Sequence, residues 1–291
     1  MSFLQYLING ISLGSVYAII ALGYTMVYGI AKMLNFAHGD VIMVGAYVIF
    51  TTISTMGYPP VVGVIVAVAL CTVLGITIER IAYKPLRGAS SLAVLITAIG
   101  VSYFLQNMAL IVFGADTKSF NSIVKFGPFH LGGLVISGET LVTIVSCIII
   151  MIILTTFINK TRAGQAMLAV SEDKGAAVLM GINVNQTIAL TFAIGSGLAA
   201  IAGALLCSAY PTLSPYTGSM PGIKAFTAAV FGGIGSIPGA FVGGILLGVI
   251  EIFGKAYISS QLSDAIVFAV LIIVLIVKPS GILGKNRQEK V

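Results

Sequence analysis

Apolar residues form long uninterrupted runs along this chain, and short polar stretches separate the runs. Several runs reach or exceed the ~20 residues that a membrane-spanning helix needs. The bilayer core has no water to satisfy backbone polar groups, so such runs must be helical. Their continuity also excludes the alternating pattern of a porin-like barrel. Examples without any Asp, Glu, Lys or Arg are 41–78, 88–115, 140–158 and 183–223.

Turn and loop signals divide the runs into predicted spans. Gly57 to Pro60 is a turn by its chemistry, and 114–138 is a loop that contains Gly, Ser and Pro. Between 224 and 256, glycines and Pro238 break the pattern into two shorter helical pieces, which either cross twice or form a re-entrant pair. The sequence predicts one all-α polytopic membrane domain, 1–291, with roughly eight or nine transmembrane helices. The predicted spans are 3–30, 41–56, 61–78, 92–113, 140–158, 186–207, 224–256 and 265–277.

A polar stretch, called here the 159–184 segment, lies between two of these runs and predicts two short helices. Thr161 can cap the first helix, because its hydroxyl can accept a hydrogen bond from an otherwise unpaired backbone N–H. Arg162 and Gly164 follow in the first turn. The small apolar face of this helix consists of Ala166, Met167, Ala169 and Val170.

The second helix of the segment carries clearer signals. Ser171 is the expected N-cap, and Glu172 and Asp173 place negative charge in the first turn, where the helix dipole is positive. Gly181 stands where a left-handed residue ends a helix. A short helix with a small-residue face suits docking into a groove of a partner. An amphipathic loop on the bilayer surface is the alternative, but the segment has no aromatic residue and nearly balanced charge. The small face is formed by Ala176, Ala177 and Val178.

Composition supports the membrane assignment. The chain is 58% hydrophobic and only 8% charged, whereas soluble domains carry about 25% charged residues. The cysteines lie inside apolar runs without metal-ligand spacing, so they are interpreted as small core residues. They are Cys71, Cys147 and Cys207.

Basic residues predict the orientation in the membrane. Ten of the fifteen Lys and Arg residues fall after the third and fifth predicted spans and in the C-terminal tail from Lys278, which includes Lys285, Arg287 and Lys290. The positive-inside rule makes these regions cytoplasmic. Five spans precede the 159–184 segment, so the N-terminus is expected outside and an odd number of crossings follows. The net charge of +6 is therefore a topology signal and not a nucleic-acid footprint.

Two short motif matches are rejected. The stretch 10–14 fits G-x-S-x-G, but its serine lies within an apolar span and not on a strand-to-helix turn. The stretch 195–200 fits G-x-G-x-x-A without a preceding strand. The sequence contains no G-x-x-x-x-G-K-[ST] motif, so any ATP must be bound by a partner. The abundant glycines at small-xxx-small spacing predict close helix packing.

Charged and polar residues beside apolar spans are functional candidates, because burying a charge costs at least ~2.5 kcal/mol on insertion scales. Asn35, His38 and Asp40 lie where the chain enters the second span. For these residues a structural role and a position beside a translocation path stay about equally supported. Glu251 and Lys255 are four residues apart, and a local ion pair is the preferred interpretation.

Five stretches of the sequence together resemble the LivH-type permease of branched-chain amino-acid ABC importers, and the resemblance covers essentially the whole chain. Within the 159–184 segment, Glu172, Ala176, Ala177 and Gly181 are similar to the EAA signature of importer permeases. In that signature the alanines follow the glutamate directly, whereas here three residues intervene. The five stretches are NFAHGD (35–40), ERIAYKPLR (79–87), SEDKGAAVLMGIN (171–183), KAFTAAVFGGIGSIPGA (224–240) and KPSGILG (278–284).

The resemblance implies a permease subunit of the cell inner membrane, without enzymatic activity and without a cofactor or metal of its own. It implies a second permease subunit of the LivM type, two ABC ATPase subunits and an extracytoplasmic substrate-binding protein, with no nucleic acid. The 159–184 segment would be the cytoplasmic ATPase-coupling loop. Its coupling residues would be Arg162, Gly164, Glu172, Asp173, Ala176, Ala177 and Gly181.

Two other classes of protein are weighed against this expectation. An ion-coupled secondary transporter acting alone would need carboxylates at the membrane midplane, and the chain has few candidates. An intramembrane hydrolase would need a histidine near a serine, and His38 is the one histidine near a predicted membrane core.

Overall fold

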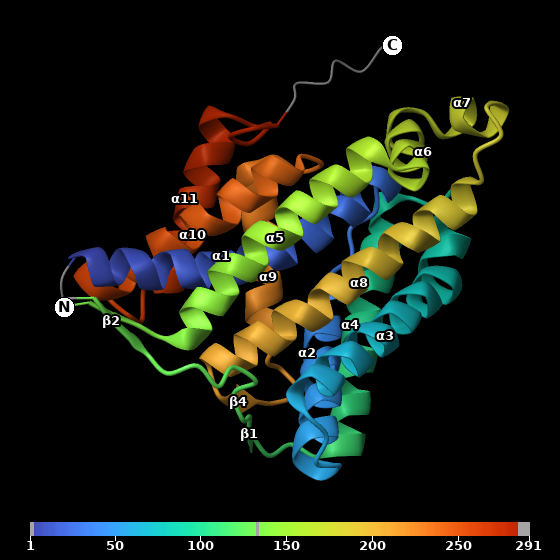
Figure 1. Ribbon diagram of the computed structural model, residues 1–291. Helices are drawn as coiled ribbons and strands as arrows, with labels where there is room; N and C mark the ends of the chain where they lie inside the picture. The colour runs from blue at the N-terminus through green and yellow to red at the C-terminus, as the bar shows by residue number, and fades with distance from the viewer. Residues whose placement is uncertain (1–2, 132–133, 285–291) are drawn as a thin grey trace.

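The computed structural model describes residues 3–131 and 134–284, and it is a bundle of helices with two very short β-sheets (Figure 1). The 159–184 segment, with α6 and α7, lies at one end of the bundle, which we call the α7 end. The opposite end carries β1 and β4 and is called the β4 end. The α-helices are α1 (Phe3–Ala31), α2 (His38–Phe50), α3 (Pro60–Ile78), α4 (Ser91–Phe113), α5 (Gly138–Lys160), α6 (Arg162–Glu172), α7 (Lys174–Leu179), α8 (Val184–Ala209), α9 (Ser219–Gly232), α10 (Ile237–Tyr257) and α11 (Ser263–Val277).

Shorter elements extend or connect these helices. Three of them are helical turns: η1 (Thr51–Thr55), η2 (Glu79–Tyr83) and η3 (Lys84–Leu86). The strands pair antiparallel as β1 with β4 and β2 with β3. They add minor β structure within and after the predicted 114–138 loop to a domain expected to be all-α. The strands are β1 (Lys118–Ser119), β2 (Phe129–Leu131), β3 (Leu134–Ile136) and β4 (Thr212–Leu213).

Within the described part of the chain, six helices are long and apolar enough to cross a membrane. They correspond to α1, α3 with its extension to Leu86, α4, α5, α8 and α10. The sequence predicts no helix between the spans 61–78 and 92–113, but helical turns continue α3 there to Leu86. The carboxylate of Glu79 pairs with Arg87, which lets these charged residues stay in a helical extension. The break predicted within 224–256 is confirmed, since α9 ends at Gly232 and α10 begins at Ile237.

Helices α1 and α10 pack antiparallel, and glycines allow their two backbones to approach closely. A Cβ atom added to Gly248 would lie 2.2 Å from the backbone nitrogen of Gly14. Added to Gly244, it would lie 2.4 Å from the Cα atom of Ala18. Such contacts allow packing where lipid supplies no hydrophobic drive. The interpretation of these glycines as close-packing positions is therefore confirmed.

The α-helical parts of α2, which η1 continues to Thr55, and of α9 are too short to cross the bilayer alone. They have 13 and 14 residues, or about 20 Å at 1.5 Å per residue, against a ~30 Å hydrocarbon core. Their N-termini meet, since a Cβ on Gly218 would lie 1.8 Å from the carbonyl oxygen of Gly39. From this point α2 leads toward the β4 end, whereas α9 leads toward the α7 end, where Gly235 lies against Gly29 (Figure 1).

Candidate functional site

The first helix of the 159–184 segment begins where the sequence predicts. The Thr161 hydroxyl oxygen accepts a hydrogen bond from the backbone N–H of Gly164 at 3.0 Å. Gly164 is needed for space, because a Cβ there would lie 2.3 Å from the carbonyl oxygen of Phe157. The predicted apolar face packs inward through Met167 and Val170, which are buried. The side chain of Arg162 is exposed.

The predicted N-cap of the second helix is wrong. Asp173 is the cap: its Oδ1 atom accepts hydrogen bonds from the backbone N–H groups of Gly175 at 2.7 Å and Ala176 at 3.0 Å. The first helix runs on to Glu172, so Ser171 lies in its last turn and donates its hydroxyl to the carbonyl oxygen of Leu168. Asp and Ser are similarly good caps, and the extra turn of α6 decides between them.

The second helix, α7, ends as predicted, and two residues of its expected face, Ala176 and Val178, are exposed. Gly181 has φ +78°, which confirms the left-handed position. Of the small residues, Ala177 packs against this chain, while Ala176 is exposed. Larger apolar side chains beside them are exposed as well, with Leu179 at 89% and Met180 at 81%. Exposed apolar residues gathered on one short helix are typical of a docking surface.

One lysine joins α7 to the end of α1. The Lys174 Nζ atom donates a hydrogen bond to the backbone carbonyl oxygen of Ala31 at 3.2 Å. Burial, and secondarily the nearby Arg87, lower the pKa of Lys174 below its ordinary value. Arg87 in turn pairs with the Glu79 carboxylate and donates to the side chain of Asn185. The 159–184 segment is thus tied to α1, and through Arg87 it lies near the extension of α3.

The three candidate path residues are all buried, but each has a different set of contacts. Asn35 accepts a hydrogen bond from the Tyr83 hydroxyl at 3.0 Å. Asp40 accepts one from the Gln106 amide at 2.9 Å. His38 packs on Tyr24, with 4.7 Å between ring centres.

Two of these candidates, His38 and Asp40, flank Gly39 in the first turn of α2, where α2 meets α9, and Asn35 lies just before this turn. Gln106 of α4 joins the two helices, because its amide bonds both Asp40 of α2 and Ser219 of α9. Sequence reasoning missed Gln106 and Tyr83. Gln106 had a signal, since it is a polar residue in the middle of an apolar span.

A second polar group, called here the charged cluster, has a buried part, Tyr17, Lys224 and Glu251, and a more exposed part, Lys255 and Asp264. The predicted pair of Glu251 and Lys255 is confirmed, with 2.6 Å between Oε1 and Nζ. The same oxygen also accepts from Lys224 at 2.8 Å, and the Tyr17 hydroxyl donates to Oε2 at 2.9 Å. Lys224 also pairs with Asp264 at 2.6 Å. The cluster therefore joins α1, α9, α10 and α11 and is more than a local helix pair.

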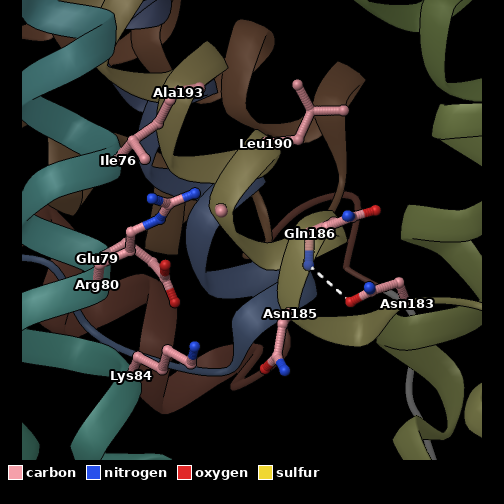
Figure 2. A pocket seen from close by; sticks show the side chains of 10 residues that line it. Ile76, Glu79, Arg80, Lys84, Asn183, Asn185, Gln186, Leu190 and Ala193 are labelled. Atoms are coloured by element: carbon pink, nitrogen blue, oxygen red, sulfur yellow. Dashed lines mark hydrogen bonds between the residues drawn. The ribbon is translucent and has the colours of Figure 1, made fainter.

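Cavities lie at both ends of the bundle. At the α7 end, a groove of about 520 Å³ separates the extension of α3 from the start of α8. Figure 2 shows Glu79, Arg80 and Lys84 along one wall and the amide side chains of Asn185 and Gln186 on the other. At the β4 end, a cavity of about 400 Å³ reaches the charged cluster.

The site has no feature of a metal centre in the part of the chain that the structure describes. No group of three or more His, Cys, Asp or Glu side chains is gathered among residues 3–131 and 134–284. Cys71, Cys147 and Cys207 are buried and free, which confirms that they fill the core.

Comparisons with known proteins match the same family over nearly the whole chain. The family described as "Branched-chain amino acid transport system / permease component" matches residues 6–275. The permease protein BraD of a high-affinity branched-chain amino acid transport system of Pseudomonas aeruginosa is 46% identical over 301 residues, covering 99% of this chain and 98% of that protein. LivH of Escherichia coli K12, a permease of the same description, is 46% identical over 302 residues with the same coverage.

A solved structure shares the fold at low sequence identity. PsaBC from Streptococcus pneumoniae, in complex with Fab, superposes with a TM-score of 0.50 at 16% identity, covering 96% of this chain and 93% of that one. The family match and the relatives at 46% identity decide the assignment. This chain belongs to the family of permease components of branched-chain amino acid transport systems.

Proposed function

We propose that this chain is the membrane-spanning permease subunit of an ATP-driven importer of branched-chain amino acids. The observation that carries the proposal is 46% identity over 99% of the chain to relatives named as high-affinity branched-chain amino acid permeases. Six apolar helices of spanning length support a multi-pass protein of the inner membrane. Its role is to move substrate and not to change it chemically, so it is no enzyme.

The complete importer contains a second, LivM-like permease, two ABC ATPase subunits and an extracytoplasmic binding protein. The absence of a P-loop motif from the sequence supports ATP binding on separate subunits. The exposed Leu179 at the end of α7 and Met180 directly after it support the 159–184 segment as the ATPase docking element.

Reconstitution tests the function directly. The complete complex in proteoliposomes is expected to take up leucine, isoleucine or valine when ATP and the loaded binding protein are present. An ionophore that collapses ion gradients should leave this uptake unchanged. Uptake that stops with the ionophore but continues without ATP would instead establish the ion-coupled secondary transporter.

The proposed orientation places the α7 end in the cytoplasm and the β4 end outside, with the N-terminus outside and the C-terminus inside. The excess of Lys and Arg after the third and fifth predicted spans and in the tail from Lys278 supports it. A reporter that is active only outside the cytoplasm is expected to be active when fused after Lys118 and silent when fused after Lys174. The opposite pattern would overturn both the topology and the coupling assignment.

Asn35, His38 and Asp40 are proposed to border the translocation path. Their support is burial at the point where α2 and α9 meet, because buried polar groups at membrane depth are costly and mark substrate pathways in transporters. Alanine at each position is expected to lower uptake while the complex still assembles. Asn107→Ala is the matched control, since Asn107 is exposed on α4 and its side chain bonds the Tyr103 carbonyl oxygen. Unchanged uptake in all three variants would assign these residues a structural role.

A further inference from the structure

The cavity at the β4 end is lined by charged, polar and apolar side chains. The charged ones are Lys224, Glu251 and Lys255 of the charged cluster. The apolar ones include Leu13 and Leu206, and hydroxyl side chains such as Thr212 lie among them. At about 400 Å³ the cavity falls within the size range of small-molecule sites. It therefore offers a polar end and an apolar side to one small ligand.

In the charged part of the lining, two lysines lie in direct contact with one carboxylate, that of Glu251. Both lysines bond the same oxygen of Glu251, Oε1, at 2.8 Å and 2.6 Å. The other oxygen, Oε2, accepts from the Tyr17 hydroxyl, and a carboxylate oxygen can accept more than one hydrogen bond. Because the side chain of Glu251 is 1% exposed, a ligand's cationic donor reaches Oε2 when the Tyr17 hydroxyl moves aside to share that oxygen.

Lys255 supplies the complementary group. Its side chain is 37% exposed, whereas those of Lys224 and Glu251 are 8% and 1% exposed. An ammonium carries three donors, and the contact with Glu251 uses one of them. Lys255 can therefore bind an anionic group in the cavity without giving up its ion pair. An anion on Lys255 and a cation on Glu251 would lie side by side, as in the head of an α-amino acid.

The position of the cavity supports a ligand that is in transit. Met220 and Pro221, in the first turn of α9, form part of its lining. This turn follows Gly218, which contacts Gly39 at the meeting point of α2 and α9. The cavity thus leads from the β4 end to the point where the two short helices close on each other.

We propose that this cavity is a binding site for the zwitterionic head and branched side chain of an aliphatic α-amino acid. The substrate carboxylate binds Lys255, its ammonium binds Oε2 of Glu251, and its side chain packs against Leu13 and Leu206. The inference rests on the proposed function and deepens it, because it gives the permease its own substrate site beside that of a binding protein.

Protection of an introduced cysteine tests the site. Thr212, exposed at the cavity wall, is changed to Cys in the assembled complex in nanodiscs without binding protein, and a maleimide labels the thiol. Leucine is expected to slow labelling in a saturable way. At equal concentration, 4-methylpentanoate lacks the ammonium and 3-methylbutylamine lacks the carboxylate, so neither should protect. Ser260→Cys, exposed in the α10–α11 loop and outside the cavity lining, is the control that leucine should not protect.

A second set of variants separates binding from a purely structural role of the charged cluster. Lys255→Met should weaken leucine protection by about tenfold, since one charge-assisted contact is lost, while Lys224 still neutralises Glu251 and the complex still assembles. Lys255→Arg should restore protection. If leucine and the two analogues protect equally, or if Lys255→Met lowers the melting temperature while protection is unchanged, the cluster only joins helices and the proposal is wrong. Failure of ATP-driven uptake by the wild-type complex would instead refute the proposed function.

Discussion

Glycine is used for different reasons in the α1–α10 contact and in the 159–184 segment. Gly248 of α10 faces the backbone of α1, where an added Cβ would lie 2.2 Å from Gly14. Around Gly181 nothing lies within 4 Å of an added Cβ, but the residue has φ +78°. The core therefore needs glycine for space, whereas the segment needs it for backbone conformation. The first requirement depends on a partner helix, and the second is local.

The largest effect is expected where space is the requirement. Gly248→Leu would force a side chain into the backbone of α1, and overpacking costs about 1–3 kcal/mol or more even in cores that can adjust. Folded protein should disappear from membranes, as measured by size-exclusion chromatography after mild solubilisation. Gly100→Leu on α4 is the matched control, because nothing lies within 4 Å of a Cβ there. Equal loss in both variants would mean that the lack of space beside Gly248 is not the cause, since leucine has a higher helix propensity than glycine at both positions.

A smaller and more specific effect is expected at Gly181. A β-branched residue in the left-handed region costs roughly 1 kcal/mol or more, so Gly181→Val should misdirect the end of α7. The complex should insert and assemble, but ATP hydrolysis should lose its stimulation by loaded binding protein. Gly181→Asn, which tolerates this conformation, should keep most of the stimulation. Normal transport by Gly181→Val would show that the segment is a surface loop without a coupling role.

Lysine substitutions at the two acidic residues that precede α7 should differ in how much they destabilise this helix. Asp173→Lys removes the cap and puts positive charge at the positive end of the helix dipole, so it should cost about 0.5–2 kcal/mol of local stability. Glu172→Lys lies in the last turn of α6, where a cation suits the dipole, and should cost less. Hydrogen exchange of the α7 amides measures both. Faster exchange in Glu172→Lys than in Asp173→Lys would contradict the cap assignment.

Local patterns in the sequence predicted the helices well. The apolar runs at 3–30 and 92–113 match Phe3–Ala31 and Ser91–Phe113 almost residue for residue, because a helix in lipid satisfies its backbone within its own run. The left-handed turn at Gly181 was also predicted, since its cause is local. The choice between Ser171 and Asp173 as cap was not, because both residue types suit the position and the length of α6 decides.

Contacts between segments that lie far apart in the chain could not be predicted from the sequence. The charges of Lys224 and Glu251 signalled partners in apolar surroundings, but nothing local indicated that they bind each other and Tyr17. Likewise Asp40 was a candidate, whereas the bridge through Gln106 to Ser219 depends on how α2, α4 and α9 pack. The meeting of Gly39 with Gly218 is of the same kind, because it joins two helix ends that lie far apart in the chain.

The smallest effect is expected at the contact that joins the two compared regions. Lys174→Met removes the hydrogen bond to the Ala31 carbonyl oxygen, but it also removes a charge that burial and Arg87 disfavour, as its lowered pKa indicates. The lost hydrogen bond and the removal of the disfavoured charge have opposite effects on stability. The free energy of unfolding should therefore change by less than about 0.5 kcal/mol. Thermal melting and α7 amide exchange measure this change, and Lys160→Met, at the exposed end of α5, is the control. A loss above about 2 kcal/mol would show that the 159–184 segment is held by its contact with α1 and not by its own caps and turn, so the two regions would then share one kind of constraint.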